Sequence, residues 1–440
     1  MTLTQQLTLC AAEHGDRPAI IWHDRVWSWA ELEADSARVA AGLTRQGIAR
    51  GDVVGLLVPN IPPFLILFFA LQRLGAVPLP INLLLRPGEI RDILEDSGAR
   101  GLVLHEVFVP LVAGLRKEGS APPALVVVGG PAPAWATGYE AVLEGTPPPT
   151  PPATGEEATA VLLYKAGPDG RTKGIMLSHR NLLHQGQMIR GGLSMTPADR
   201  TLLVLPLYHV FGIGVVLQSA LATGSAVVLL EKFDPDDVLR ALSDHAVTLF
   251  FGVPTMYAML LRQASRADYA LPEPLRLCIC GAAPLPVEIA HRFEATFGAP
   301  IVEGYGLTEA AGATSVNPGG RIKLGTIGPA IAGNDMRILG PDGRERPPGE
   351  VGEIAVRGRN VMEGYFRRPA ELTRRAVREG WLHTGDVGWM DPDGYFTIVA
   401  RKHDLIIVGG ENVYPREVED RLREIPGVSD AAVRGVPHPI

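Results

Sequence analysis

Two kinds of segment alternate along most of this 440-residue chain: short apolar runs, and longer stretches with helical spacing of apolar residues. Short runs suit strands that are buried on both faces, whereas apolar residues three or four positions apart suit helices that pack on a sheet. In the first part of the chain the predicted strands are residues 53–58, 77–81 and 101–105, and the predicted helices are 63–74 and 87–97. In the second part the predicted strands are residues 161–164, 201–205, 226–230, 249–251 and 275–280, and the predicted helices are 178–191, 212–222, 236–244 and 254–263.

This alternation predicts an α/β fold with two doubly wound subdomains built on parallel strands. Residues 130–154 are rich in Pro, Gly and Ala, and we interpret them as a linker or a long surface connection between the two series. The expected subdomains are therefore about 1–155 and 156–324. In each of them, ligands are expected at the carboxyl ends of the strands.

The pattern changes after about residue 325, where turn signals such as Pro341-Asp-Gly343 separate short apolar runs at residues 352–357 and 395–399. These features predict a smaller β-rich subdomain over residues 325–400. From Arg401 a third unit is predicted: a strand with Gly409-Gly410, a helix at 415–424 and a strand at 431–436. So few elements bury little core, and we expect residues 401–440 to be a hinge and the start of an incomplete α+β C-terminal domain.

Composition narrows the class of protein. The net charge is −7 and no long basic run is present, which argues against a nucleic-acid partner. The N-terminus lacks the features of a signal peptide, and the apolar run at residues 64–71 is too short to cross a membrane, so a cytoplasmic protein without a transmembrane segment is expected. Cys278 and Cys280 are spaced as same-face residues of a strand, and we interpret them as core thiols rather than metal ligands.

Five stretches carry the chemistry. They are YKAGPDGRTKG from residue 164, PLYHVFG from 206, EGYGLTEA from 303, HTGD from 383 and RKHDLIIVGGENVYPREVE from 401. Their order and spacing resemble the adenylate-forming superfamily of acyl-CoA synthetases, adenylation domains and luciferases. The stretches at residues 251–257 and 350–357 resemble the acyl-CoA synthetase branch most, and residues 281–284 match the family's adenine strand.

The resemblance implies a reaction in two steps. A carboxylate attacks the α-phosphate of ATP to give acyl-AMP and pyrophosphate, and a thiol then attacks the acyl-AMP. The implied cofactors are ATP, Mg²⁺ and CoA, or the phosphopantetheine of an acyl carrier protein in place of CoA. Bringing an anion to a polyanion requires positive charge and hydrogen-bond donors that are placed in advance.

The resemblance also assigns roles at the nucleotide. Tyr305 would pack on the adenine, Asp386 and Arg401 would contact the ribose, Thr308 would meet the α-phosphate, and Glu309 would hold Mg²⁺. By itself the Gly-Tyr-Gly-Leu-Thr-Glu stretch could be only a turn leading into a helix. The catalytic residues implied are Thr308, Glu309, Lys173 and His209. The nucleotide-binding residues implied are Gly167, Gly170, Lys173, Gly281, Ala282, Ala283, Glu303, Gly304, Tyr305, Gly306, Thr308, Asp386 and Arg401.

His209 follows an apolar strand and could be a core histidine, but in the family the matching histidine flanks the acyl carboxylate. The acyl-binding residues implied are Tyr208, His209, Phe211, Gly212, Val253, Gly306 and Leu307. This lining has no Arg or Lys that could pair with a second carboxylate. A hydrophobic monocarboxylic acid, fatty or aryl, is therefore expected as the substrate.

The first stretch departs from the family's phosphate loop. Tyr164, Gly167, Gly170, Lys173 and Gly174 keep the frame, but the hydroxyl residues between them are gone. Hydroxyl groups donate hydrogen bonds to phosphate oxygens, and the replacing Ala and Pro side chains cannot. A carboxylate at position 169 would repel a phosphate, while the lysine at 165 could neutralise it or reach the phosphates. We hypothesise that the loop binds ATP but holds pyrophosphate weakly; a loop that only turns the chain is the alternative.

Two further departures concern the end of the chain. His403 occupies the family's hinge position, which usually carries Asp or Lys, and the family's catalytic lysine would lie beyond Ile440. Adenylation is therefore expected to be impaired in this chain. Three readings stay open at this point: an acyl-CoA synthetase, a ligase that loads a carrier protein, and a non-catalytic nucleotide or acyl binder. A purely structural protein has no support beyond a stable core.

Overall fold

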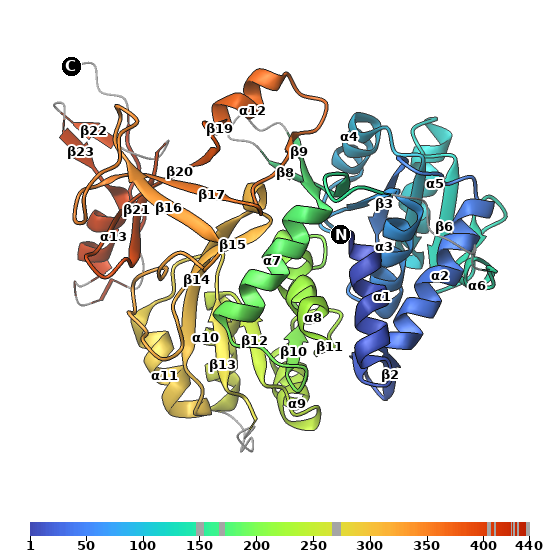
Figure 1. Ribbon diagram of the computed structural model, residues 1–440, viewed down its shortest axis with the longest axis horizontal. Helices are drawn as coiled ribbons and strands as arrows, with labels where there is room; N and C mark the ends of the chain where they lie inside the picture. Colours follow the sequence, from blue (N-terminus) through green and yellow to red (C-terminus); the bar gives the residue numbers. More distant parts are fainter. Residues whose placement is uncertain are drawn as a thin grey trace.

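The computed structural model describes residues 1–146, 154–166, 172–265, 274–402, 406–408, 411–423, 425, 427–428 and 431–436. The described chain has the predicted α/β fold, with sheets arranged side by side and helices packed on them (Figure 1). The N-terminal sheet lies at one end and the β-rich region at the other. The division of the chain at about residues 155, 324 and 400 stays a prediction.

The N-terminal sheet has five parallel strands in the order β4-β3-β5-β6-β7. Its strands are β3 (Val53–Leu57), β4 (Val77–Pro80), β5 (Gly101–His105), β6 (Ala124–Val128) and β7 (Thr137–Gly138). Its helices are α2 (Trp29–Arg45), α3 (Pro62–Leu74), α4 (Pro87–Ser97), α5 (Val109–Lys117) and α6 (Tyr139–Leu143). Strand β7 and helix α6 lie inside the stretch predicted to be a linker, and that interpretation was wrong for residues 137–143. Tyr139 and Val142 are buried there, so apolar contacts hold this Pro- and Gly-rich stretch on the subdomain.

The larger sheet has eight strands in the order β15-β14-β13-β12-β10-β11-β1-β2. Its predicted strands are β10 (Arg200–Leu203), β11 (Ala226–Leu229), β12 (Leu249–Gly252) and β13 (Leu277–Cys280), all parallel. The other strands are β1 (Pro18–Trp22), β2 (Arg25–Ser28), β14 (Ile301–Leu307) and β15 (Gly312–Val316), of which β2 and β15 form the two edges. Strand β1 pairs with β11 although about 200 residues separate them, and no local pattern indicates this pairing.

Helices cover the larger sheet as predicted, with one local difference. The predicted helices are α7 (His179–Gly192), α8 (Leu217–Thr223), α9 (Pro235–Asp244) and α10 (Pro254–Ala264), and one further helix, α11 (Val287–Phe297), was not predicted. The predicted helix at 212–222 begins as a π-helix, η2 (Phe211–Val216), and continues as α8. A π-turn widens the backbone locally and is typical of functional sites. Gly212 is required here, because a Cβ at this position would lie 2.5 Å from the Pro206 carbonyl oxygen.

Residues 161–164 lie in a hairpin rather than in a parallel strand. Strand β8 (Thr159–Ala166) pairs antiparallel with β9 (Thr172–Ser178), and β18 (Gly364–Tyr365) pairs with β9. The prediction of a parallel strand was wrong because a fully apolar run is compatible with parallel and with antiparallel pairing. The strand with which it pairs determines its orientation.

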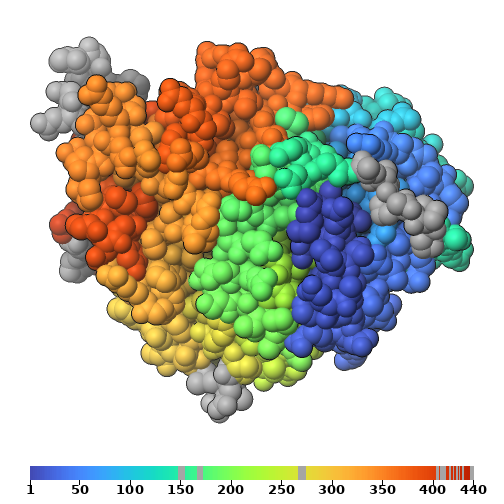
Figure 2. Space-filling model, in the orientation of Figure 1, coloured from blue at the N-terminus to red at the C-terminus, as the bar shows by residue number. Residues whose placement is uncertain are grey.

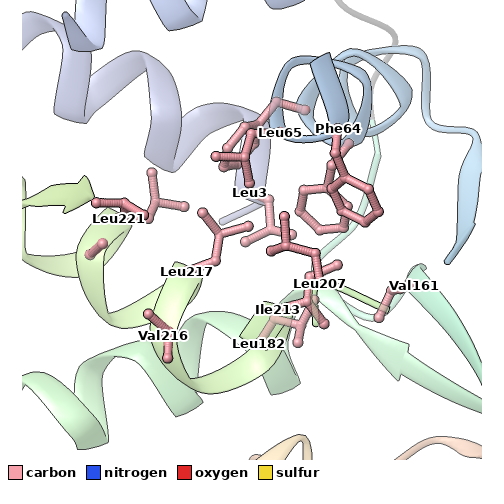
Figure 3. Packing of buried hydrophobic residues seen from close by; sticks show 14 of the residues in the cluster. Leu3, Phe64, Leu65, Val161, Leu182, Leu207, Ile213, Val216, Leu217 and Leu221 are labelled. Atoms are coloured by element: carbon pink, nitrogen blue, oxygen red, sulfur yellow. The ribbon is translucent and has the colours of Figure 1, made fainter. Parts of the chain in front are cut away.

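The two large parts share one hydrophobic core. Helix α1 (Leu3–His14) begins with a capping box at Thr2 and packs between α3 and α8 (Figure 3). Leu3, Phe64 and Leu217 meet there, and all three are buried. Helix α3 is apolar on all sides over residues 64–71, and every residue from 64 to 74, including Gln72 and Arg73, is buried, as expected for a helix enclosed by protein.

The predicted β-rich region forms a sheet in the order β16-β17-β20-β19, with β21 paired to β20. Its elements are β16 (Asn334–Leu339), β17 (Gly352–Gly358), α12 (Ala370–Ala376), β19 (Val377–Arg378), β20 (Trp381–Met390) and β21 (Phe396–Arg401). The segment around α12 reaches across the molecule to the N-terminal subdomain (Figure 2), where Arg367 donates to the Asp96 carbonyl oxygen at 3.0 Å.

Beyond Arg401 the structure describes β22 (Ile406–Val408), β23 (Glu411–Val413) and α13 (Pro415–Arg423). Helix α13 matches its prediction, whereas the predicted strand at 431–436 was wrong: these residues have no regular secondary structure. Their apolar residues have no neighbouring strand to pair with among the described residues, and an isolated run gains no ladder hydrogen bonds. Gly409, Gly410 and His403 lie outside the described residues.

Candidate active site

A cavity of about 230 Å³ opens where parallel strands of the larger sheet end. Strands β12, β13 and β14 contribute Phe251, Cys280 and the stretch 304–307 at their carboxyl ends, which is where α/β folds bind ligands. The lining residues are Lys165, Ile189, Leu193, His209, Val210, Phe211, Val215, Phe251, Ile279, Cys280, Gly281, Ala282, Gly304, Tyr305, Gly306, Leu307, Thr308, Gly312, Ala313, Ser315, Val316 and Arg401.

One end of the cavity is polar and carries the predicted ribose residues. Asp386 and Arg401 are paired across β20 and β21, and the Arg401 Nε lies 3.5 Å from the Asp386 Oδ1. The Tyr305 hydroxyl donates to the Asp386 Oδ2 at 2.5 Å. Burial and the Asp386 carboxylate raise the pKa of Tyr305 well above its ordinary value, so the hydroxyl keeps its proton. The three side chains therefore form one cluster, although 96 residues separate the first from the last in sequence.

The backbone around β13 and β14 is shaped for close approach. Ala282 has a φ of +68°, and the Gly281 N–H donates to the Gly252 carbonyl oxygen at 3.2 Å. A Cβ at Gly306 would lie 1.8 Å from the Gly312 carbonyl oxygen, so only glycine fits where β14 meets β15. Glu303, which directly precedes Gly304 in β14, is buried, and its Oε1 accepts from the Leu285 N–H at 3.4 Å.

Glu309 lies in the short 3₁₀ helix Thr308–Ala310 that follows β14. Its side chain is 6% exposed, and its two carboxylate oxygens lie 2.6 and 2.7 Å from the Lys165 Nζ. The Tyr365 hydroxyl donates to the Oε1 at 3.2 Å. Burial and this carboxylate raise the pKa of Tyr365, which keeps the hydroxyl protonated. The predicted metal ligand thus lies beside the predicted phosphate loop.

The stem of the predicted phosphate loop consists of the ends of β8 and β9 and lies beside Glu309. The tip of the loop, residues 167–171, lies outside the described residues. Lys165 and Lys173 are directly opposite in the β8–β9 ladder, and the Lys173 Nζ lies 5.8 Å from the centre of the Tyr365 ring. Directly opposite residues share a face of the hairpin, so both ammonium groups belong to the side that carries Glu309. Gly167, Gly170 and the carboxylate at position 169 lie outside the described residues, and the hypothesis of weak pyrophosphate binding stays a prediction.

Asp96 anchors this stem to helix α4. Its carboxylate accepts from the Tyr164 hydroxyl at 2.6 Å and from two guanidinium nitrogens of Arg368 at 2.9 and 3.2 Å. Partial burial raises the pKa of Asp96, but the hydrogen bonds from Arg368 and Tyr164 outweigh it and lower the pKa below its ordinary value.

We expect Asp96→Asn to lower the free energy of unfolding by about 1 kcal/mol at pH 7, since the hydrogen bonds from Tyr164 and Arg368 to a partly exposed charged group are weakened. A lowered pKa stabilises the fold only above the unfolded value near 4, and this contribution is lost as the pH falls through the folded pKa. Urea unfolding at pH 7, 5 and 3 should show a gap between wild type and variant that closes with acid. Asp92→Asn, an exposed carboxylate on the same helix, should leave stability nearly unchanged. An equal gap for Asp96→Asn at all three pH values would contradict this role.

The other end of the cavity is apolar. Phe211 and Phe251 form an edge-to-face pair with ring centres 6.1 Å apart. His209 lines the cavity, and its Nδ1 accepts from the Phe211 N–H at 3.2 Å. The surrounding protein lowers the pKa of His209 through desolvation, so the ring is neutral at pH 7 even though solvent reaches it through the cavity.

Many of the predicted residues are thus brought together around the cavity. The predicted residues that line it are His209, Phe211, Gly281, Ala282, Gly304, Tyr305, Gly306, Leu307, Thr308 and Arg401. Glu309 and Asp386 are not lining residues but contact them: Glu309 contacts Lys165, and Asp386 contacts Tyr305 and Arg401. Predicted residues outside the lining are Lys173, Tyr208, Gly212, Val253, Ala283 and Glu303.

Sequence reasoning missed residues of the apolar lining and one polar neighbour. Ile189 and Leu193 lie four positions apart at the end of α7, so their shared face was a usable signal. Val215, Ala313 and Val316 gave no signal, because their position depends on how η2 packs on β15. Tyr365 was missed because its contact with Glu309 spans 56 residues.

Within the described part of the chain, no three His, Cys, Asp or Glu side chains cluster as a preformed metal site. Cys278 and Cys280 are buried in β13, where burial raises the pKa of both thiols, consistent with core residues. In the described helices, no segment is both long and apolar enough to cross a membrane.

Comparison with known proteins agrees with this geometry. Residues 7–366 match the profile of the AMP-binding enzyme family. The feruloyl-CoA synthase of an Amycolatopsis species is 40% identical over 414 residues, which cover 94% of this chain and 81% of that protein. The structure of the anthranilate-CoA ligase AuaEII with anthranoyl-AMP superposes with a TM-score of 0.92 at 28% identity, covering 99% of this chain and 85% of the other.

A further solved structure, of the Bacillus subtilis o-succinylbenzoate-CoA synthetase with ATP and magnesium, has a TM-score of 0.86 at 30% identity and covers 99% of this chain and 87% of that one. The chain therefore belongs to the AMP-binding enzyme family and is an acid–thiol ligase of the AMP-forming type.

Proposed function

We propose that this chain activates a hydrophobic monocarboxylic acid, fatty or aryl, as its acyl-AMP and then transfers the acyl group to CoA. The observation that carries the proposal is that one cavity has both polar and apolar lining residues. Tyr305, Thr308 and Arg401 line its nucleotide end, and the apolar end begins at His209. A carboxylate that lies near His209 therefore has its tail in an apolar pocket and its oxygens toward the phosphates.

The apolar end favours acids without a second charge. Its walls include Ile189, Val215, Ile279 and Val316, all apolar. Ser315 also lines the cavity, but its hydroxyl already donates to the Ile327 carbonyl oxygen at 2.9 Å. A second carboxylate or a sulfonate would lie there without a partner, which costs far more than an apolar group gains. The aryl and fatty acids are therefore favoured over dicarboxylic acids.

The nucleotide end supplies positive charge for the first step. Lys165 and Lys173 come from the hairpin, and the Thr308 hydroxyl faces the same space. Groups fixed in advance stabilise the charge that develops on the α-phosphate without reorganising during the reaction. A magnesium ion would fit at Glu309, because Mg²⁺ is commonly held by one carboxylate together with phosphate oxygens and waters, and it would act there as a Lewis acid.

The remaining assignments follow the family resemblance. Asp386 and Arg401 would bind the ribose, Tyr305 the adenine, and Gly281 to Ala283 the edge of the base. His403 would be the hinge between the adenylation domain, residues 1–400, and residues 401–440. CoA is the favoured acceptor because the compared proteins are CoA ligases; the phosphopantetheine of a carrier protein is the alternative thiol.

The experiment is an incubation of the purified chain with ATP, Mg²⁺ and a panel of acids from acetate to long-chain fatty acids, with benzoates and cinnamates. Mass spectrometry would detect acyl-AMP, and a second incubation with CoA or with a phosphopantetheinylated carrier protein would detect the thioester. We expect acyl-AMP from apolar monocarboxylic acids and none from malonate or succinate. A preference for the dicarboxylic acids would refute the proposal.

Ala313 offers a direct test of the acyl pocket. It lies opposite Gly306 in the β14–β15 ladder and lines the cavity. We expect Ala313→Phe to lower kcat/KM for the larger acids about 10- to 100-fold, because overpacking costs roughly 1–3 kcal/mol, while the smallest active acid is affected least. The matched control Ala313→Ser changes volume little and should keep the size profile. A uniform loss across all acids with Ala313→Phe would contradict this placement.

A further inference from the structure

The Lys165–Glu309 ion pair has an uncommon geometry for a surface lysine. The ammonium group lies within 2.7 Å of both carboxylate oxygens, so it occupies the carboxylate in the way that a bound cation would. Glu309 is buried, whereas the Lys165 side chain is 42% exposed. The buried partner is fixed by its surroundings, and the exposed partner is free to leave along the cavity that it lines.

The surroundings of the pair explain why Lys165 is held there. Lys165 and Lys173 are directly opposite on one face of the hairpin, where two like charges repel each other. Glu309 relieves this repulsion by accepting Lys165, and the Tyr365 hydroxyl fixes the carboxylate from the other side. Without a counter-cation, the buried carboxylate would carry an uncompensated charge.

The ammonium group contacts both oxygens, so a divalent cation bound to either of them would lie within a few ångströms of it. Two cations within a few ångströms repel strongly where water is largely excluded, and Mg²⁺ requires its oxygen ligands at close to 2.1 Å in near-octahedral geometry. Contact of Glu309 with Lys165 and contact of Glu309 with a metal therefore oppose each other. Lys165 lines the cavity, so the phosphate chain of a nucleotide bound there would offer the released ammonium group another anion.

We infer that Lys165 is a built-in cation that competes with Mg²⁺ for Glu309, and that it binds the phosphates of ATP when metal displaces it. This inference rests on the proposed function, because Glu309 is taken as the metal ligand. It has two consequences. The nucleotide complex binds metal more weakly than it would without Lys165. In the absence of metal, the chain binds ATP more tightly than it would without Lys165.

Metal binding can be measured without turnover. Mn²⁺ is a spectroscopic substitute for Mg²⁺ with the same preference for oxygen ligands, and electron paramagnetic resonance reports its free concentration. With the α,β-methylene analogue of ATP present, Lys165→Met should bind Mn²⁺ about tenfold more tightly than wild type, the effect of removing one competing ion pair. With EDTA present, the same variant should bind the analogue several-fold more weakly by calorimetry.

Two further variants keep the test decisive. Lys165→Arg keeps the positive charge and should keep the weaker Mn²⁺ binding of wild type, and Lys232→Met removes an exposed lysine elsewhere and should change neither affinity. An unchanged Mn²⁺ affinity in Lys165→Met, with the analogue still bound, would refute the competition between Lys165 and the metal and would leave the proposed function standing. Failure of wild type to bind the analogue under any condition would refute the proposed function and the competition with it.

Discussion

Replacing Glu309 by Gln is expected to lower the rate of acyl-AMP formation about 100- to 1000-fold, the range found when one group that stabilises transition-state charge is removed. Glutamine keeps the size of the side chain and can still accept from Tyr365, so the shape of the site is preserved. It lacks the negative charge that would hold a divalent cation beside the phosphates. The measurement is the acid-dependent exchange of pyrophosphate into ATP at saturating ATP.

Stability is expected to change little in this variant, because the released Lys165 can be solvated through the cavity. Glu363→Gln is the matched control. Glu363 is a carboxylate from a neighbouring segment that accepts from Ser178 and Arg180, away from the cavity. An equal loss of exchange in both variants would show that general damage to this region, rather than the charge of Glu309, explains the effect.

Asp386→Ala is expected to lower kcat/KM for ATP about 100-fold or more, with the loss mainly in KM. A carboxylate can accept from both ribose hydroxyls, and hydrogen bonds to a charged group contribute roughly 1.5–3 kcal/mol each. The substitution also leaves the Tyr305 hydroxyl and the Arg401 guanidinium without the acceptor that they share. Initial rates at varied ATP with a fixed, saturating acid would measure the effect.

Tyr305→Phe distinguishes direct ribose binding by Asp386 from a role in which Asp386 only positions Tyr305. It keeps the ring that would pack on adenine and removes only the hydroxyl that donates to Asp386. We expect a loss of less than about fivefold, because one hydrogen bond of roughly 1 kcal/mol is removed. A loss as large as that of Asp386→Ala would contradict direct ribose binding and would mean that Asp386 acts by positioning Tyr305.

The outline of the α/β fold could be predicted from local patterns. Helix α4 and strand β5 were predicted with their observed bounds, because their ends carry local signals: Pro87 begins the helix and Gly98, with a φ of +63°, ends it. The stretches from 303 and 383 also indicated the nucleotide end. The two stretches lie in β14 and β20, strands of different sheets, and the hydrogen bond from Tyr305 to Asp386 joins them.

Errors arose where the partner of a segment decided its structure. The run at 161–164 gave no indication of an antiparallel hairpin, and the run at 431–436 had the composition of a strand but none of its hydrogen bonds. The stretch at 137–143 looked like a linker because Pro and Gly dominate around it, yet Tyr139 and Val142 bury enough apolar surface to fix it on the subdomain.

The sequence by itself determined the alternation of strands and helices, the apolar α3, and the glycines and polar residues that mark the nucleotide end. These features depend on periodicity and on side-chain chemistry, which act within a few residues. Tertiary structure alone decided the pairing of β1 with β11, the Asp96–Arg368 contact across 272 residues and the Lys165–Glu309 pair across 144. Contacts between residues so far apart in sequence depend on which surfaces the packed core brings together. The local spacing of residues does not indicate these contacts.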